Sequence, residues 1–304
     1  MSGRTGGEAG TAPAGGTGGG TGTGPAGGTG GRAAPRPAPG RRTAIVTGGA
    51  SGIGRAVCRE LARRGAHVVV ADVDGAGAER AAKELGCASA ELDVTDARAV
   101  GDLVGRVRRE HGRLDFMFNN AGIAVGGTTD ELTLDHWNRT IDVNLRGVVH
   151  GVHAAYPVMV EQGFGHIVNT ASLAGLTPAP LMLPYTATKH AVVGLSLALR
   201  AEARAHGVRV SVVCPGFTDT PLLDHANPGL PRTAVSEGAR QAAVGIQRRL
   251  YSVDALAGDI IRGVARDRAL IVAPASGRLA WRAVRLSPAA AVRVAALAER
   301  RLRG

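Results

Sequence analysis

Seven short runs that are typical of β-strands alternate with helical stretches, and this alternation restricts the fold more than any other feature of the chain. Amphipathic stretches between the runs include residues 55–64 and 97–111. Connections of that length join parallel strands through crossover helices. The sequence therefore predicts an α/β, Rossmann-type doubly wound fold, with a seven-stranded parallel sheet and helices on both faces. The predicted strands are residues 43–47, 67–72, 88–92, 114–118, 166–170, 208–213 and 269–272.

The two ends of the chain differ in composition from this central part. Residues 1–40 hold 16 of the 45 glycines and almost no large apolar side chain, which predicts a disordered leader; a misassigned start codon is an equal alternative. Residues 41–275 are the predicted dinucleotide-binding and catalytic domain. Within it, the polar segment at about 221–250 is expected to form a lid over the substrate. Residues 276–304 are predicted to be an Arg-rich helical extension, interrupted at Ser287 and Pro288.

The net charge of +11 comes in large part from this C-terminal extension. Residues 277–304 carry seven arginines and one glutamate, so the rest of the chain is only mildly basic. Because no basic patch is interleaved with aromatic residues, nucleic-acid binding is not expected. The extension is predicted to pack on the body of the protein or on a second subunit. A weak peripheral membrane contact is the alternative.

Three cysteines without a CxxC spacing argue against a disulfide framework and against a zinc site, and no metal is expected. The histidines show no metal-ligand grouping such as HExxH. No run of 18 apolar residues occurs, and the N-terminal stretch lacks the apolar core of a signal peptide. The protein is therefore predicted to be cytoplasmic.

A glycine-rich turn, TGGASGIG at 47–54, separates the first predicted strand from the first predicted helix. Its glycines allow the backbone to approach a pyrophosphate, whose charge the helix N-terminus stabilises. Asp72 closes the second strand, where a carboxylate would accept a hydrogen bond from an adenosine ribose and repel a 2′-phosphate. NAD is therefore favoured over NADP, although Arg55 would partly offset that repulsion. The alternatives are that the glycine-rich turn serves only packing and that Asp72 is an ordinary cap at the end of the strand.

Tyr185 and Lys189 lie four residues apart on a predicted helix, so their side chains share a face. A tyrosine with an ordinary pKa of ~10 is a poor base at neutral pH. A neighbouring ammonium stabilises the phenolate, so the pair predicts a lowered pKa for Tyr185. Such a pair alone is typical of a solvated helix face. Ser172, however, is placed at the end of the fifth strand, the sheet edge at which doubly wound folds bind ligands.

Taken together, TGGASGIG, NNAG at 119–122, VNLRG around Asn144, the set of Ser172, Tyr185 and Lys189, and CPGFTDT at 214–220 resemble the short-chain dehydrogenase/reductase family. The resemblance covers about residues 41–275 in order and spacing. It implies that Tyr185 is the general acid/base and that Lys189 lowers its pKa and holds the nicotinamide ribose. It also implies that Ser172 polarises a substrate carbonyl and that Asn144 supports a water of the proton relay.

The resemblance further implies where a nicotinamide cofactor binds. Asp93 and Val94 would flank the adenine, and Thr220 would bind the carboxamide and fix the nicotinamide face. The implied cofactor contacts are Thr47, Gly48, Ser51, Gly52, Ile53, Gly54, Asp72, Asp93, Val94, Asn120, Ala121, Gly122, Tyr185, Lys189, Pro215, Gly216, Thr218 and Thr220.

The family implies an NAD(P)-dependent oxidoreductase that transfers a hydride between a secondary alcohol or ketone and the cofactor. The segment at 173–184 is apolar and would form part of the pocket wall, which favours an apolar or amphipathic substrate. A homodimer or homotetramer is expected. The alternative is a non-catalytic, NAD(P)-binding regulator or scaffold, which the intact Ser172, Tyr185, Lys189 and Asn144 disfavour.

Overall fold

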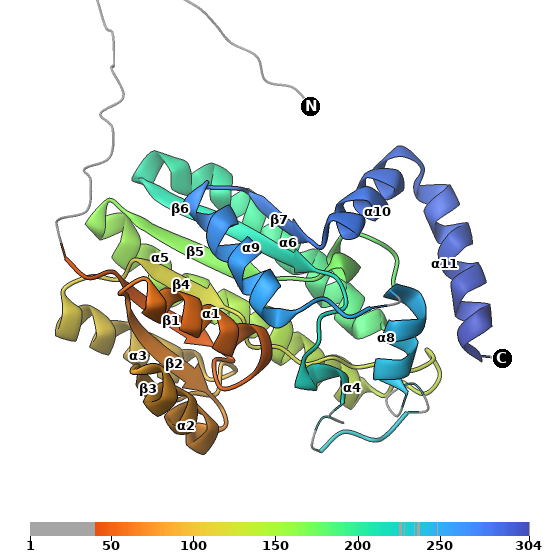
Figure 1. Ribbon diagram of the computed structural model, residues 1–304, viewed down its shortest axis with the longest axis horizontal. Helices are drawn as coiled ribbons and strands as arrows, with labels where there is room; N and C mark the ends of the chain where they lie inside the picture. Colours follow the sequence, from red (N-terminus) through yellow and green to blue (C-terminus); the bar gives the residue numbers. More distant parts are fainter. Residues whose placement is uncertain are drawn as a thin grey trace, which may run out of the picture. The chain divides into compact units, whose positions relative to one another are not determined.

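The alternation of strands and helices produces a seven-stranded sheet in the computed structural model, and every strand pair is parallel (Figure 1). The structure describes residues 40–224, 227, 229–233, 235, 238–247 and 249–303, all within a unit that spans residues 34–304. The strand order is β3-β2-β1-β4-β5-β6-β7. The strands are β1 (Thr43–Thr47), β2 (His67–Asp72), β3 (Ala88–Glu91), β4 (Phe116–Asn119), β5 (Gly165–Thr170), β6 (Val208–Pro215) and β7 (Leu270–Ala273).

The predicted doubly wound fold is confirmed, and the boundaries of β1 and β2 agree with the prediction residue for residue. The main differences are at β4, which begins at Phe116 rather than at residue 114, and at β6, which continues to Pro215. The helices are α1 (Gly52–Arg63), α2 (Gly75–Leu85), α3 (Ala97–His111), α4 (Leu134–Ile141), α5 (Gly147–Gln162), α6 (Leu183–Ala203), α8 (Ala239–Gln247), α9 (Val253–Ala265), α10 (Ala275–Leu286) and α11 (Pro288–Arg303).

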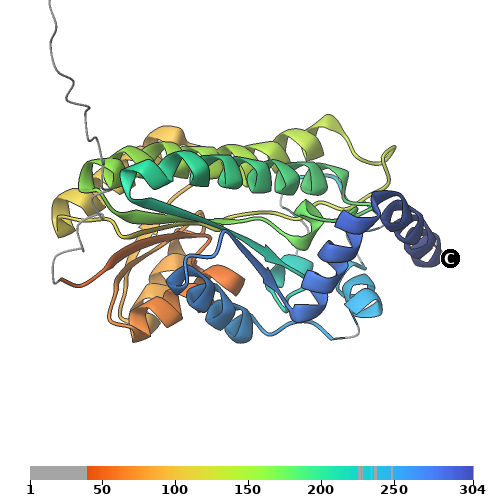
Figure 2. The same cartoon turned by 90° about the horizontal axis from the view of Figure 1, so that it is seen from above.

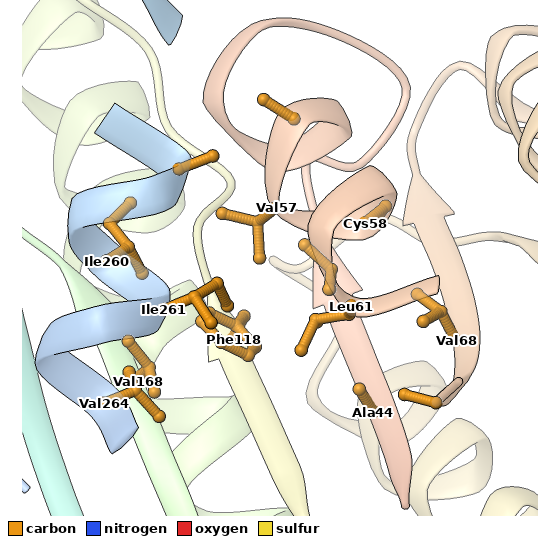
Figure 3. Packing of buried hydrophobic residues seen from close by; sticks show 14 of the residues in the cluster. Ala44, Val57, Cys58, Leu61, Val68, Phe118, Val168, Ile260, Ile261 and Val264 are labelled. Carbon is orange, nitrogen blue, oxygen red and sulfur yellow. The ribbon is translucent and has the colours of Figure 1, made fainter. Parts of the chain in front are cut away.

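Helices cover both faces of the sheet, as Figure 2 shows. On one face α1 and α9 pack side by side, and Val57, Leu61, Ile260 and Val264 meet the sheet around Phe118 (Figure 3). On the other face α3, α5 and α6 bury a second set of side chains. All five residues of β1 are buried. Burial on two faces explains the continuous apolar runs in the sequence.

The order of the strands reverses at β1, which lies between β2 and β4. At such a switch point the connections leave toward opposite faces of the sheet, and a crevice opens at the carboxyl ends of the strands. The glycine-rich turn follows β1, and the NNAG segment begins at the end of β4. Both therefore lie at this crevice.

The predicted leader lies almost entirely outside the described residues, which begin at Gly40. The C-terminal extension forms α10 and α11, and the helix is interrupted at Ser287 and Pro288 as predicted. Trp281 of α10 packs against a core cluster that includes residues of α5 and α6. Among the described helices, none combines the length and the apolar character needed to cross a membrane.

Candidate active site

The turn after β1 returns so close to the NNAG segment that only glycine fits at two positions. Gly48 has a φ of +64°, and a Cβ there would lie 2.8 Å from Cα of Ala121. A Cβ on Gly54 would overlap the carbonyl oxygen of Gly48 and lie 2.7 Å from Nδ2 of Asn120. Ser51, the N-cap of α1, makes no side-chain bond to the first helical turn. The N–H groups of that turn are thus left for a ligand, as a pyrophosphate requires.

Thr47 and Asn120 connect the glycine-rich turn, the cradle for the pyrophosphate, to the NNAG segment through hydrogen bonds. Oγ1 of Thr47 accepts hydrogen bonds from the backbone N–H groups of Asn120 and Ala121, at 3.0 and 3.1 Å. Nδ2 of Asn120 donates to the carbonyl oxygens of Thr47 and Gly48, at 3.1 and 3.3 Å. The hydroxyl of Thr170 donates to Oδ1 of Asn120, at 3.3 Å. The ends of β1, β4 and β5 are therefore joined by one side-chain network.

Asp72 ends β2 with its carboxylate fixed by two backbone donors. Oδ2 accepts from the N–H of Ala50 at 3.0 Å, and Oδ1 accepts from the N–H of Asp74 at 3.1 Å. Each carboxylate oxygen retains a second lone pair for a ligand hydroxyl. The guanidinium of Arg55, in contrast, forms an ion pair with Glu84 of α2. The charge of Arg55 is therefore partly neutralised by a carboxylate.

The segment after β3 presents its backbone beside the same crevice. Asp93 is turned inward on its own loop, where Oδ1 accepts from the N–H and the hydroxyl of Thr95, at 2.9 and 2.8 Å. The carbonyl of Val94 is bonded to Nδ1 of His150, at 2.9 Å. The Val94 side chain lies against Gly147, where a Cβ would come within 2.7 Å of it. This packing fixes the loop that the resemblance assigns to the adenine.

Ser172, Tyr185 and Lys189 come together at the carboxyl end of β5. Ser172 lies two residues after β5, and its hydroxyl accepts from the N–H of Ala174 at 3.1 Å. Tyr185 and Lys189 occupy successive turns of α6, with Nζ of Lys189 5.5 Å from the centroid of the tyrosine ring. Nζ of Lys189 donates to the carbonyl oxygen of Thr170, at 2.9 Å. The ammonium therefore bridges α6 to the end of β5.

The predicted lowering of the Tyr185 pKa is wrong for this arrangement. Burial raises the pKa of Tyr185, and a hydrogen bond with Ser172 offsets only part of that increase. Burial also lowers the pKa of Lys189 from 10.5 to about 8. At neutral pH the phenol is protonated.

Asn144 lies behind this set, on a π-helical turn (Asp142–Arg146) between α4 and α5. It is fully buried, and its amide binds the backbone of Ile123: Oδ1 accepts from the N–H at 2.8 Å, and Nδ2 donates to the carbonyl at 2.9 Å. Nδ2 also lies 3.5 Å from the hydroxyl of Thr188 on α6. π-Helical turns inside α-helices often occur at functional sites.

One cavity of about 780 Å³ collects most of the predicted site residues. The predicted residues that line it are Gly48, Ser51, Gly52, Ile53, Asp72, Asp93, Val94, Asn120, Ala121, Gly122, Ser172, Tyr185, Lys189, Pro215, Gly216, Thr218 and Thr220. Thr47, Gly54 and Asn144 are absent from its lining. These three residues lie next to lining residues and keep them in position.

The match to known proteins covers the segments that build this site. Residues 42–230 match the family model for short chain dehydrogenases. The chain belongs to the short-chain dehydrogenase family.

Relatives of this short-chain dehydrogenase include oxidoreductases of several bacteria. It is 36% identical over 198 residues to the oxidoreductase YxjF of Bacillus subtilis. The aligned region covers 64% of this chain and 77% of that protein. It is 34% identical over 202 residues to D-beta-hydroxybutyrate dehydrogenase of Rhizobium meliloti, covering 63% and 77%. A short-chain dehydrogenase/reductase from Burkholderia phymatum, solved in complex with NAD, has a TM-score of 0.73 and 31% identity and covers 81% and 95%. The chain is thus a nicotinamide-dependent dehydrogenase acting on CH–OH donors.

The sequence analysis expected the segments at 173–184 and about 221–250 on the substrate side of this short-chain dehydrogenase, but not α4 or α11. The cavity is lined by His136 and Arg139 of α4, by Leu230 and Pro231 of the segment between β6 and α8, and by residues of α8. Ala295, Ala298 and Glu299 of α11 also line it. α4 and α11 carry no motif and are far apart in the chain, so only their folded positions disclose this role. The amphipathic pattern of α11 was visible, but the cavity beneath it was not.

Proposed function

We propose that this dehydrogenase transfers a hydride between NAD and a secondary alcohol or ketone. The observation that supports this most directly is that Ser172, Tyr185 and Lys189 line the same cavity as the glycine cradle. Doubly wound folds bind ligands at that edge. The non-catalytic scaffold has no comparable support, because a scaffold has no need of a protonated tyrosine beside a serine hydroxyl in a cavity.

The proton step belongs to Tyr185 and Ser172. A nicotinamide, when bound, supplies or accepts the hydride. In the direction of ketone reduction, the Tyr185 hydroxyl donates its proton to the carbonyl oxygen, and the Ser172 hydroxyl donates a hydrogen bond to the same oxygen. Alcohol oxidation needs the phenolate. Its rate should therefore rise with pH toward the raised pKa of Tyr185.

Lys189 and Asn144 support this pair. Lys189 lines the cavity and would bind the ribose hydroxyls of the cofactor. To Asn144 we assign the support of a water in the proton relay, because its amide fixes the backbone of Ile123 beside the cavity. Thr220, which lines the cavity with Thr218, would hold the carboxamide. The other predicted contacts would hold the pyrophosphate, the adenine and its ribose.

The preference for NAD over NADP follows from charge. The two N–H donors fix the Asp72 carboxylate at the end of β2, where it would repel a 2′-phosphate. Arg55 pairs with Glu84, which partly neutralises the charge that could otherwise attract a 2′-phosphate. The solved relative in complex with NAD agrees with this preference.

The substrate pocket favours an apolar or amphipathic carbonyl compound. Its walls include Leu173, Leu181 and Met182 from the segment before α6, and Leu223 and Ile246 from the lid and α8. Higher turnover on polar sugars than on hydrophobic ketones in a substrate panel would contradict this assignment.

Residues at about 221–250 would serve as the lid. Nδ2 of Asn227 donates to the carbonyl oxygen of Ala124 at 2.6 Å, and Nε2 of His136 lies 2.9 Å from the carbonyl oxygen of Pro231. Such contacts hold the lid segment against the loop after β4 and exclude water from the reacting groups.

We further propose a homodimer or homotetramer in the cytoplasm. Val149 of α5 and Leu197 of α6 are exposed, as helix faces that pack between subunits often are. Cys58, Cys87 and Cys214 are free thiols, which suits a reducing compartment.

Cofactor binding to the purified protein tests the proposal. NADH and NADPH are compared by fluorescence titration for the parent, Asp72→Ala and Tyr185→Phe. Tighter NADH binding in the parent, relaxed toward NADPH in Asp72→Ala, supports the assignment of the carboxylate. Tyr185→Phe should bind NADH normally but lose about 10²- to 10⁴-fold in turnover, as expected for a general acid. Failure to bind either cofactor, or full turnover in Tyr185→Phe, contradicts the proposal.

A further inference from the structure

The outward faces of the two C-terminal helices, α10 and α11, carry exposed apolar side chains. Leu279 and Leu286 of α10 are 67% and 88% exposed, and Leu297 of α11 is 58% exposed. Leu279, Arg282 and Leu286 are three and four residues apart, so they share one face of α10. Trp281, on the opposite face, packs toward the core. An exposed apolar stripe of this kind marks a binding surface.

Arginines accompany these leucines. Residues 277–304 hold seven arginines and one glutamate, six of the eleven net positive charges of the chain. Arg282 of α10 and Arg293 of α11 are exposed and have no ion-pair partner among the described residues. Apolar side chains with neighbouring arginines on a helix are the pattern that binds the interface of an anionic bilayer.

A second copy of the chain fits this face less well. In a symmetric dimer each patch meets the same patch, so two arginine-rich surfaces would be brought together. Like charges brought together across an interface cost free energy. An anionic lipid surface has the opposite charge, and therefore complements both the leucines and the arginines.

One side of α11 lines the cavity, and the opposite side belongs to the exposed outer face. Ala295 and Ala298 line the cavity, whereas Arg293 and Leu297 lie toward the opposite side of the same helix. Figure 1 shows α11 at the end of the molecule beside α8. A surface bound to the outer side of α11 would lie one helix diameter, about 10 Å, from the cavity.

We propose that the outer face of α10 and α11 docks this dehydrogenase on an anionic membrane surface. Leu279, Leu286 and Leu297 enter the headgroup region while Arg282 and Arg293 bind lipid phosphates. No described helix crosses the membrane, so the contact is peripheral. If the proposed function is also right, an apolar ketone dissolved in the lipid reaches the cavity past α11.

Sedimentation of the full-length protein with vesicles tests this. Vesicles of phosphatidylcholine alone are compared with vesicles that also contain phosphatidylglycerol. The protein should bind only the second kind. Arg282→Gln combined with Arg293→Gln should lower the partition coefficient about 30-fold, at about five-fold per arginine. Leu286→Ser should lower it about ten-fold through lost apolar burial.

Matched controls sit elsewhere on the surface. Arg106→Gln with Arg266→Gln removes the same charge, and Leu134→Ser removes a leucine that is 76% exposed on α4. Both should leave binding within about two-fold, because these sites lie off the docking face. NADH binding checks that each variant is folded. Since sedimentation does not depend on turnover, failure of the proposed reaction would leave this result unaffected.

Three results would overturn the proposal. The first is no binding to phosphatidylglycerol vesicles. The second is equal loss of binding in the control variants and in the docking-face variants. The third is a fall in the molar mass of Leu286→Ser by sedimentation equilibrium without a change in vesicle binding, which would make this face a subunit contact.

Discussion

Alanine at position 54 should weaken cofactor binding while the fold persists. The Cβ of an alanine there would overlap the carbonyl oxygen of Gly48 and lie 2.7 Å from Nδ2 of Asn120, where contacts under 3.0 Å are essentially never found. Either α1 or the turn before it must therefore move by about 1 Å. A displacement of about 1 Å at a binding group can cost about 10²-fold. We expect Gly54→Ala to weaken NADH binding by about that factor.

Gly65→Ala is the matched control. Gly65 follows α1 with a φ of +79°, but a Cβ there would have no neighbour within 4 Å. Only backbone strain of about 1 kcal/mol is added, which lowers Tm by about 2–4 °C. NADH affinity is measured by fluorescence titration, and Tm by calorimetry, for both variants. NADH affinity in Gly54→Ala within a few-fold of the parent would refute the argument that this contact shapes the cradle.

Two further predictions concern Ser172 and His166. Ser172→Ala should lower kcat about 10²-fold, because one donor to the developing oxyanion is lost; steady-state kinetics checks this, and an unchanged kcat would exclude that role. His166 is buried against the hydroxyl of Ser211, 2.8 Å away, and burial lowers its pKa from 6.5 to about 4. Between pH 4 and pH 6.5 the unfolded state therefore binds more protons than the folded state. The contribution of His166 to the free energy of unfolding is fully present above pH 6.5 and is lost as the pH falls toward 4, by up to about 3 kcal/mol. Urea unfolding across that range should show this slope in the parent and a smaller slope in His166→Gln; equal slopes would contradict it.

The fold could be predicted because its signals are local. Strands buried on both faces must be apolar along their whole length, so β1 and β2 are visible as continuous runs. The end of β6 was less visible. Cys214 and Pro215 extend it by pairing with β7. A proline ends most strand predictions, but this register depends on a partner strand more than 50 residues later in the chain.

The cofactor side of the site was predictable for a related reason. The backbone passes close to itself after β1, and only glycine at positions 48 and 54 allows this. The two glycines are therefore visible in the sequence as a signal of the turn. The pKa of Tyr185 was not predictable. Helical spacing places Lys189 near the ring, but burial and the hydrogen bond to Thr170 determine what the ammonium does.

The substrate side of the cavity was harder to predict from the sequence. Its walls come from α4, the segment at about 221–250, which includes α8, and α11. These elements share no common motif and come together only in the folded chain. Each residue there has to match a substrate rather than the backbone, so its identity carries no general constraint that could be read in advance. Ala295 and Ala298 illustrate this: in the sequence they are small residues of an amphipathic helix, and in the structure they line the same cavity as Tyr185. The chemistry of the reaction is therefore encoded near the strand ends, whereas the choice of substrate is encoded in the segments that cover them.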